Sequence, residues 1–344
     1  MPADEQGVAG SADRYALIPR TLCFVLNGAD ILLLRGAPTK RIWPGRYNGI
    51  GGHVERGEDV HYAARREILE ETGLQAERLQ LCGTVNVDSG EGRGILLFVF
   101  VAHVAARDTC ASAEGTLHWV PQQQAAQYEL VEDLPVILPR ALAVAAGAAP
   151  FAAHPPRACW ACTRSRQRGS AEAVAMPADE QGVAGSADRY ALIPRTLCFV
   201  LNDGDVLLLR GAPTKRIWPG RYNGIGGHVE RDEDVHSAAR REILEETGLH
   251  AERLQLCGTV NVDTGAERGI VLFVFVAHAA VRNTTASAEG TLEWVPVQQA
   301  AQYDLVEDLP VIMPRALAVA AGAEPFAAHY SYDAQQKLAI RFAE

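Results

Sequence analysis

The sequence predicts a layered α/β fold that occurs twice along the chain. Residues 1–154 recur as residues 176–329 with 19 differences, which is a period of whole domains rather than of a solenoid. Within each copy, strand-like segments are mixed with two helical segments, as in layered α/β domains. Met176 repeats the initial methionine, which indicates an in-frame fusion of duplicated genes. At 344 residues the chain is long enough for two such domains.

The expected domain boundaries follow this repeat. Copy one spans residues 1–154, a basic linker containing prolines and arginines spans 155–175, and copy two spans 176–344 with a C-terminal tail from about residue 330. Two repeats tethered in this way have a high effective concentration for each other, and an intramolecular pseudo-dimer is one expected arrangement. If the linker is flexible, it would span on the order of 25 Å.

Each copy is expected to begin with a β-hairpin. Thr21–Leu26 and Asp30–Leu34 are apolar runs on either side of Asn27-Gly28, and this dipeptide is a strong hairpin signal. The next segment, Gly36–Asn48, contains two prolines and further glycines. We expect it to form a loop.

A helix is predicted after this loop. Asp59 would place a carboxylate at the helix start, where the helix dipole favours it, and Gly73 would supply a left-handed end. The apolar residues mostly follow helical spacing and give one face to pack on a core: Val60, Ala63, Ala64, Ile68 and Leu74.

Three strands and a second helix complete the copy. The strands are expected at Leu79–Val87, Gly94–His103 and Thr116–Val120, of which the second is rich in Val, Leu and Phe. The helix is expected at Val136–Ala146, although Pro139 interrupts its first turns.

Three glutamates gather on one side of the first helix. Glu67, Glu70 and Glu71 stand at positions i, i+3 and i+4, which are neighbours on a helix surface. Like charges placed in this way destabilise a bare helix by a few tenths of a kcal/mol per pair, so an opposite charge is expected there. Arg66 projects about 100° away around the helix, and a hard divalent cation with oxygen ligands is the better candidate.

This helix and the loop before it resemble the Nudix box. The run Gly-(x5)-Glu-(x7)-Arg-Glu-Ile-x-Glu-Glu-x-Gly-Leu matches that box from Gly52 to Leu74 and again from Gly227 to Leu249. A lone Glu-x-x-Glu-Glu would indicate a solvated helix face in most proteins, but so many fixed positions are specific to the superfamily. The resemblance implies two α/β/α sandwich domains in tandem, each with a mixed β-sheet.

The resemblance also implies a metal site in each copy. Nudix enzymes hold Mg²⁺, or alternatively Mn²⁺, through the box glutamates and the carbonyl of the glycine before the box. The implied ligands are Gly51, Glu67, Glu70 and Glu71 in copy one, and Gly226, Glu242, Glu245 and Glu246 in copy two. Metal ions in such sites polarise phosphoryl oxygens and lower the pKa of the attacking water.

The catalytic roles implied by the resemblance fall on the same helix. A glutamate that is not consumed by metal can act as the base, and the residues leave two candidates in each copy: Glu67 or Glu70, and Glu242 or Glu245. Arg66 and Arg241 are expected to orient a glutamate through a charge-assisted hydrogen bond. Glu58 and Glu233, at the helix starts, are expected to pair with these arginines.

One further acid often comes from a downstream strand or loop in this family. Glu91 in copy one and Glu267 in copy two are the candidates. They are offset by one residue, because Ala266 is the counterpart of Glu91. The alternative, that both are solvated turn residues, is equally well supported.

The segment Trp43–Gly52 resembles that of MutT-type enzymes, which clear oxidised guanine triphosphates, except that Ile50 replaces an aromatic residue. Asn48 and Asn223 match the asparagine that reads the purine edge in that group. An amide presents a donor and an acceptor together. The alternative is that Asn48 only makes a turn before Gly49.

Two other features bear on base recognition. The acidic pairs Glu132-Asp133 and Glu307-Asp308 resemble a pair that reads the base in the same subgroup, although acids before a helix are also ordinary caps. Tyr128 and Trp43 could stack on a base, but core packing is the commoner role for such residues.

The expected phosphate contact departs from the MutT pattern. A lysine often follows the second glycine in that group, whereas this chain has His53 and His228. Phosphate binding is then expected to fall more to Arg35 (Arg210 in copy two), Lys40 or Arg46. The alternative is that the histidine is a surface residue.

Cysteines do not indicate a disulfide framework. Cys159 and Cys162 in the linker could be half a zinc site or a redox pair, but structural zinc needs four ligands and the sequence has no second such pair. Incidental thiols are the favoured interpretation. Four of the other cysteines recur in both repeats beside apolar segments, which favours buried thiols.

These features predict a Mg²⁺-dependent pyrophosphohydrolase that cleaves nucleoside triphosphates, oxidised purine nucleotides among them, to monophosphate and pyrophosphate. The alternatives are a hydrolase of another nucleoside diphosphate linked to a further group, or a non-catalytic nucleotide-binding module. A net charge of −10 argues against binding of duplex nucleic acid. The N-terminal residues Met1 to Tyr15 are polar and acidic and lack the apolar core of a signal peptide, and the longest apolar run, Ala141 to Ala153, is too short to span a bilayer. A cytoplasmic location without membrane contact is therefore the default expectation.

Overall fold

The computed structural model describes residues 14–40, 43–88, 93–112, 114–154, 189–215, 217–285 and 289–343. These residues form two compact units. The first unit contains the described residues of 17–190, and the second contains residues 14–16 and 191–343. The expected linker, with Cys159 and Cys162, lies outside the described residues, so its boundaries stay a prediction.

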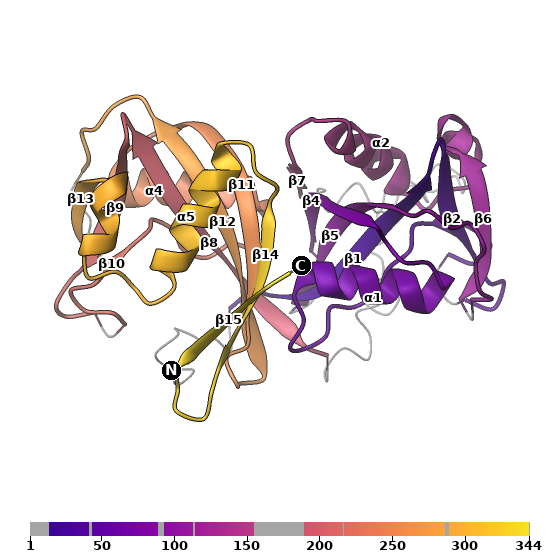
Figure 1. Ribbon diagram of the computed structural model, residues 1–344, viewed down its shortest axis with the longest axis horizontal. Coiled ribbons are helices and arrows are strands. Elements are labelled where there is room, and N and C mark those ends of the chain that lie inside the picture. Colours follow the sequence, from indigo (N-terminus) through magenta and orange to yellow (C-terminus); the bar gives the residue numbers. More distant parts are fainter. Residues whose placement is uncertain are drawn as a thin grey trace, which may run out of the picture. The chain divides into compact units, whose positions relative to one another are not determined.

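The first unit is built from the first repeat (Figure 1). Its elements in chain order are β1 (Ala16–Asn27), β2 (Asp30–Gly36), β3 (Tyr47–Asn48), α1 (Val60–Thr72), β4 (Arg78–Val87), β5 (Arg93–His103), β6 (Gly115–Pro121), the 3₁₀ helix η1 (Gln122–Gln127), α2 (Leu134–Ala145) and β7 (Phe151–Ala153).

The second unit repeats this order and adds a hairpin at its end. Its elements are β8 (Ala191–Asn202), β9 (Asp205–Gly211), β10 (Tyr222–Asn223), α4 (Val235–Thr247), β11 (Ala251–Val262), β12 (Arg268–Ala279), β13 (Gly290–Pro296), the 3₁₀ helix η3 (Val297–Gln302), α5 (Leu309–Ala320), β14 (Phe326–Tyr332) and β15 (Leu338–Phe342).

Each unit contains a mixed β-sheet, which confirms the predicted fold class. In the second unit β8 pairs with β12 in parallel, β12 pairs with β11 antiparallel, and β11 pairs with β14 in parallel. In the first unit β4 is antiparallel to β5 and parallel to β7. The β2 strand pairs with β1, β3 and β6. Its pairing with β3 holds the segment that precedes α1 against β2.

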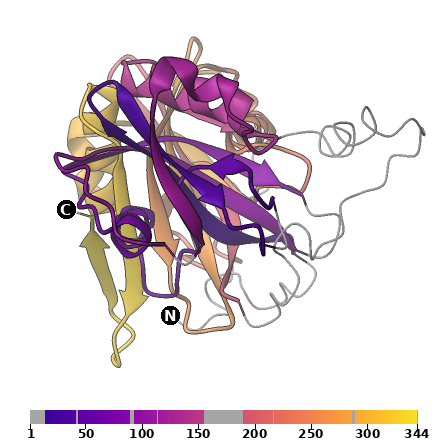
Figure 2. The same ribbon diagram turned by 90° about the vertical axis from the view of Figure 1, so that its right-hand side faces the viewer.

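The two helices of a unit cover opposite faces of its sheet. Leu22, Phe24 and Leu26 of β1 share a core cluster with the apolar face of α2, whereas the equally buried Cys23 alternates to the other face. The carboxylates of α1 raise the pKa of the Cys23 thiol beyond the effect of burial, which places Cys23 on the α1 side. Figure 1 and Figure 2 show α1 and α2 on different sides of the strands.

The predicted hairpin and the limits of the first helix are confirmed. β1 and β2 are antiparallel with Asn27 opposite Asp30, and Gly28 in the turn has a φ of 58°. Asp59 caps α1 by accepting hydrogen bonds from the backbone N–H groups of His61 and Tyr62, both 2.9 Å long. Gly73 ends α1 in the left-handed conformation.

The structure also extends or adds elements that the pattern did not indicate. β1 begins at Ala16 and not at Thr21, so Pro19 and Arg20 lie within the strand. The segment predicted as a loop contains the two-residue strand β3, and the residues after about 330 continue β14 and form β15. Such short strands carry too little periodicity to be recognised, and their pairing partners supply most of the stabilisation.

Candidate functional site

The three glutamates of α1 do not share one environment. Glu67 and Glu71 are turned towards the protein and are half-buried, whereas the side chain of Glu70 is 60% exposed. The same division holds in α4, where the side chain of Glu245 is 59% exposed. The inward pair and the outward glutamate can therefore play different chemical roles.

Arg66 joins the glutamates to the loop before α1. Its guanidinium donates to Glu58 Oε1 at 2.7 Å, to Glu67 Oε1 at 2.8 Å and to Glu70 Oε2 at 3.1 Å. It also donates to the backbone carbonyl of His53 at 2.9 Å. The hydrogen bonds that Arg66 donates to Glu58, and then to Glu67, raise its pKa despite the opposing effect of burial.

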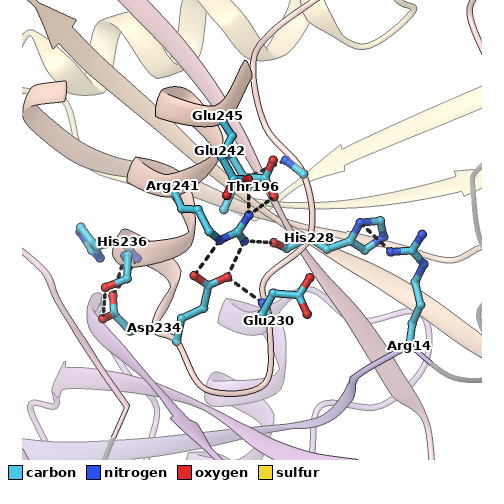
Figure 3. A network of polar contacts seen from close by, with 12 residues as sticks. Arg14, Thr196, His228, Glu230, Asp234, His236, Arg241, Glu242 and Glu245 are labelled. Carbon is cyan, nitrogen blue, oxygen red and sulfur yellow. Dashed lines mark hydrogen bonds and ion pairs between the residues drawn. The ribbon is translucent and has the colours of Figure 1, made fainter. Parts of the chain in front are cut away.

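Arg241 makes the same contacts in the second unit (Figure 3). It donates to Glu233 at 2.6 Å, to Glu242 at 2.8 Å and to Glu245 at 3.1 Å. The pairing of Arg66 with Glu58 and of Arg241 with Glu233, expected from the resemblance, is thus present in the structure. Each arginine also holds two of the three box glutamates in place.

Glu71 and Glu246 are half-buried residues whose carboxyl groups have incomplete hydrogen bonding. Glu246 accepts one bond from the backbone N–H of Gly226, at 3.1 Å, and Oε2 of Glu71 is buried with no hydrogen-bond partner among the described residues. Burial, and then the nearby Glu114, raises the pKa of Glu71 to about 8. Burial and Glu289 raise the pKa of Glu246 to about 7.

Two adjacent glycines fit the backbone against these carboxylates. Gly51 has a φ of 150°, and a Cβ there would collide with the carbonyl of Thr21. A Cβ on Gly52 would lie 2.5 Å from the carboxylate of Glu67. The loop therefore passes directly over Glu67, and any side chain on Gly52 would displace that carboxylate.

Replacing Gly52 and Gly227 together by alanine is expected to reduce turnover at least about 100-fold while the protein still folds. The reason is that the added methyl group moves Glu67 and Glu242, and a displacement of about 1 Å in a reacting site can cost that much. Steady-state rates and a circular dichroism melt would measure the two effects. Replacing Gly147, whose added Cβ would meet nothing within 4 Å, is the control for the glycine-to-alanine change, although its φ of 109° adds some backbone strain.

The acidic face suits a hard divalent cation. Within the described ranges, no group of three or more His, Cys, Asp or Glu side chains lies together in a form that could hold a metal, and Glu67 and Glu70 both accept hydrogen bonds from Arg66. However, Glu71 keeps an unsatisfied buried oxygen, and burial also raises the pKa of Glu67. Oxygen donors that are buried without a counter-charge fit a cation such as Mg²⁺.

Glu114 and Glu289 are acids near the site that the sequence patterns did not indicate. Each is bound by a lysine, Lys40 or Lys215, at 2.6 Å, and each raises the pKa of the buried glutamate in its unit. These two acids occupy matching positions in the repeats, but so do nearly all residues, so the repeat held no signal that distinguishes them. Of the acids expected instead, Glu91 lies outside the described residues, and Glu267 is exposed in the turn before β12.

His53 and His228 are half-buried residues, not surface residues. His53 forms an isolated bridge with Arg20 of β1, and His228 does the same with Arg195 of β8. Burial, and then the neighbouring arginine, lowers the pKa of His53 and of His228 to about 3. Both imidazoles are therefore neutral at physiological pH, and each stands beside a guanidinium from the middle of a strand.

The cations expected to bind phosphate have partners within the protein. Arg35 donates to the carbonyl of Gly45 at 3.2 Å and lies over the ring of Tyr47, as Arg210 does over Tyr222. Lys40 is paired with Glu114. Arg46 lies 3.3 Å from Glu132. A phosphate would have to compete with these contacts.

The residues expected to read the base lie in neighbouring backbone segments. Oδ1 of Asn48 accepts a bond from the N–H of Gly49 at 2.8 Å, which is the turn contact considered above, and Asn223 repeats it. Val131 donates to the carbonyl of Tyr47 at 3.0 Å, so the acidic pair Glu132-Asp133 follows directly on the segment beside Asn48.

Asp133 and Asp308 precede their helices, but their side chains make no capping hydrogen bond. Burial raises the pKa of each to about 6. Tyr128 and Trp43 pack against the core cluster of the first unit, and Tyr128 lies edge-on to Tyr47 with ring centroids 5.0 Å apart. These aromatic residues therefore have a packing role in this structure.

No helix in the part of the chain that the structure describes is long and apolar enough to cross a membrane.

Comparison with known proteins gives two matches to one domain family. The NUDIX domain pattern matches residues 16–141 and 192–316. The mouse (Mus musculus) protein named oxidized purine nucleoside triphosphate hydrolase is 29% identical over 144 residues, which are 42% of this chain and 88% of that protein. Nucleoside triphosphatase NudI of Escherichia fergusonii is 33% identical over 117 residues, covering 31% of this chain and 83% of that protein. Among solved structures, a MutT protein from Bacillus halodurans is 25% identical with a TM-score of 0.38, covering 44% of this chain and 97% of that one.

Proposed function

Because the chain belongs to the NUDIX family, whose pattern matches more than half of it in two places, we propose that each unit is a divalent-metal-dependent pyrophosphohydrolase. Its substrates would be nucleoside triphosphates, cleaved to monophosphate and pyrophosphate. The relatives named for hydrolysis of oxidised purine nucleoside triphosphates and of nucleoside triphosphates support this substrate class.

The observation that carries the proposal is that each box helix turns two half-buried glutamates towards the protein, Glu67 and Glu71 in α1 and Glu242 and Glu246 in α4. Glu71 and Glu246 have strongly raised pKa values and lie beside the arginine-bound Glu67 and Glu242. Carboxylates that are buried without a counter-charge are costly for the fold. A site that holds a cation compensates this cost, whereas a non-catalytic binding module would not need such a cluster.

The residues of each unit divide the chemistry between them. When bound, the divalent metal would polarise the phosphoryl oxygens and lower the pKa of the attacking water. Glu67, Glu71 and the carbonyl of Gly51 would hold it in the first unit. Arg66 fixes Glu67 and Glu70 by hydrogen bonds of 2.8 and 3.1 Å. Glu70 is exposed to solvent, so it is our candidate for the base that accepts the proton of the attacking water and passes it to solvent.

The purine specificity would come from Asn48 and the acidic pair beside it. The turn contact uses one lone pair of Oδ1 of Asn48, and the NH₂ group of Asn48 can donate to an acceptor on the base. A carboxyl with a pKa near 6, as in Asp133, can be protonated in the complex and donate as well. This pair of donors suits a base edge that offers acceptors, such as the N7 and O6 edge of guanine.

The test is a product assay with Mg²⁺ and a panel of normal and oxidised purine triphosphates, ADP-ribose, NADH and dinucleoside polyphosphates. The expected result is release of monophosphate and pyrophosphate from a purine triphosphate. Preferred hydrolysis of ADP-ribose, NADH or a dinucleoside polyphosphate would contradict the triphosphate assignment. Absence of turnover, with binding of a nucleotide by calorimetry, would show instead that the units are binding modules.

A further inference from the structure

A cluster of arginines surrounds the histidine that replaces the expected lysine. In the second unit, Arg14 lies 3.0 Å from Nδ1 of His228, and Arg195 lies 3.1 Å from its Nε2 (Figure 3). The carbonyl of His228 accepts a bond from Arg241 at 2.8 Å. The cluster is thus one hydrogen bond away from the arginine that holds Glu242 and Glu245.

The first unit contains the corresponding cluster. Arg20 forms an isolated backbone bridge with His53, as Arg195 does with His228. Burial, and then Arg189, lowers the pKa of Arg20, whereas Glu114 and Glu67 raise it. Nε of Arg20 and Nε2 of His53 are buried and have no hydrogen-bond partner among the described residues.

The short segment before the first strand of each repeat is anchored in the unit where its arginine lies. In the second unit, Arg268 donates to the carbonyl of Arg14 at 3.5 Å, and Arg231 lies over the ring of Tyr15. In the first unit, Arg93 donates to the carbonyl of Arg189 at 3.3 Å, and Arg56 lies over the ring of Tyr190. The division of the chain into units gives the same assignment, because residues up to Ala16 belong with 191–343 and Tyr190 belongs with the first repeat.

The arrangement around His228 is chemically incomplete. An imidazole has at most one acceptor nitrogen, so it cannot accept hydrogen bonds from both Arg14 and Arg195. Two guanidinium groups on either side of one ring repel each other, and burial, and then Arg14, lowers the pKa of Arg195 to about 10. An anion beside the ring would receive hydrogen bonds from both arginines and remove the repulsion.

Other cations near the acidic face are held by carboxylates. Lys40 and Lys215 are bound to Glu114 and Glu289 at 2.6 Å, and Arg66 is bound to three carboxylates. The arginine cluster is instead joined to Arg241 through the backbone carbonyl of His228.

We propose that Arg195 with Arg14, and Arg20 with Arg189, form the subsite that binds the terminal phosphates of the substrate, beside His228 and His53. This proposal rests on the proposed function of the same sites. It adds that each site takes one phosphate-binding arginine from the segment preceding the other repeat, so Arg14 serves the second unit and Arg189 serves the first.

The experiment uses the full chain with one site inactivated at a time. In the Glu71→Gln chain, only the second site is active, and Arg14→Ala is expected to raise the KM for a purine triphosphate about tenfold while kcat falls much less. A tenfold change corresponds to about 1.4 kcal/mol, a typical value for a hydrogen bond to a charged group. In the Glu246→Gln chain, Arg189→Ala is expected to have the same effect on the first site.

Matched controls remove an exposed arginine from the active unit. Arg253→Ala is the control for Arg14→Ala, and Arg140→Ala is the control for Arg189→Ala. Both control residues are exposed, and each control variant changes the net charge by the same amount as its test variant. Lysine at position 14 or 189 is expected to recover part of the KM. The proposal would be overturned if Arg14→Ala or Arg189→Ala changed the KM no more than its control variant. It would also be overturned if, in the Glu71→Gln chain, Arg189→Ala changed the KM and Arg14→Ala did not.

A binding measurement separates this proposal from the function itself. Calorimetric titration with inorganic pyrophosphate and Mg²⁺ is expected to show weaker binding after joint replacement of Arg14 and Arg189 by alanine, about tenfold at each site. If the single-site chains hydrolyse no nucleotide, the proposed function fails whatever the arginines do. If they are active and pyrophosphate binds the variant lacking Arg14 and Arg189 as tightly as it binds the parent chain, only the proposal of the arginine subsite fails.

Discussion

Joint replacement of Glu71 and Glu246 by glutamine is expected to abolish nucleotide hydrolysis and to stabilise the metal-free protein at pH 8 to 9. Loss of two carboxylates that would bind the metal should lower kcat by at least about 1,000-fold in a reaction driven by metal-stabilised charge. The stabilisation follows from burial, which raises the pKa of Glu71 to about 8 and of Glu246 to about 7.

The sign of the pH effect follows from proton binding. The ordinary pKa of these groups is 4.5, so between that pH and their folded-state pKa the native protein holds more protons than the unfolded chain. The free energy of unfolding therefore falls as the pH rises through this window. A glutamine resembles the protonated form, so the variant should lose this pH dependence and match the parent chain near pH 4.5.

Thermal melts with a chelator, and again with Mg²⁺, would measure both effects. We expect the variant to melt at a higher temperature than the parent at pH 8, by about 2–4 °C for each kcal/mol gained. Mg²⁺ should raise the melting temperature of the parent and leave that of the variant nearly unchanged. Equal stabilisation of both proteins by Mg²⁺, or hydrolysis that survives the double replacement, would contradict the role assigned to these glutamates.

The features that could be predicted from sequence are those fixed by local spacing. Asn27-Gly28 sets the hairpin, Asp59 and Gly73 set the ends of α1, and the i, i+3, i+4 spacing sets the glutamates side by side. Each of these depends on contacts within a few residues, which is why a single sequence suffices to read them.

The features that could not be predicted depend on pairing between distant segments. Lys40 and Glu114 are 74 residues apart in sequence, and the antiparallel pairing of β2 with β6 brings their segments together. Arg20 reaches His53 because β1 forms isolated bridges with the loop before α1. A charged residue inside an apolar strand was nevertheless a usable signal, since burial of an arginine needs a partner or a function.

Replacement of Arg66 by methionine is expected to destabilise the first unit and to inactivate its site. The side chains of Glu58 and Glu67 are each only 13% exposed, so removal of the guanidinium would leave two poorly solvated carboxylates without their counter-charge. Breaking a buried ion pair from one side typically costs about 3–5 kcal/mol. Arg66 is itself partly exposed, so we expect the lower end of that range, about 3 kcal/mol.

Urea denaturation and steady-state kinetics in the Glu246→Gln chain, where only the first site is active, would measure the two losses. Arg140→Met is the control, because Arg140 is an exposed residue of α2. Lysine at position 66 should recover part of the stability, since it restores the charge but cannot present the planar fork that meets Glu58 and Glu67 together.

A double-mutant cycle with Glu58→Gln separates the ion pair from general damage to the helix. If Glu58 destabilises the Arg66→Met chain only because its carboxylate has lost its counter-charge, Glu58→Gln should stabilise the Arg66→Met chain. The same replacement should destabilise the parent chain. Activity should not return in the double variant, because Glu67 and Glu70 would still lack the group that holds them 2.8 and 3.1 Å from its nitrogen. Recovery of activity together with stability would mean that Arg66 serves the fold alone, and that the glutamates reach their catalytic positions without it.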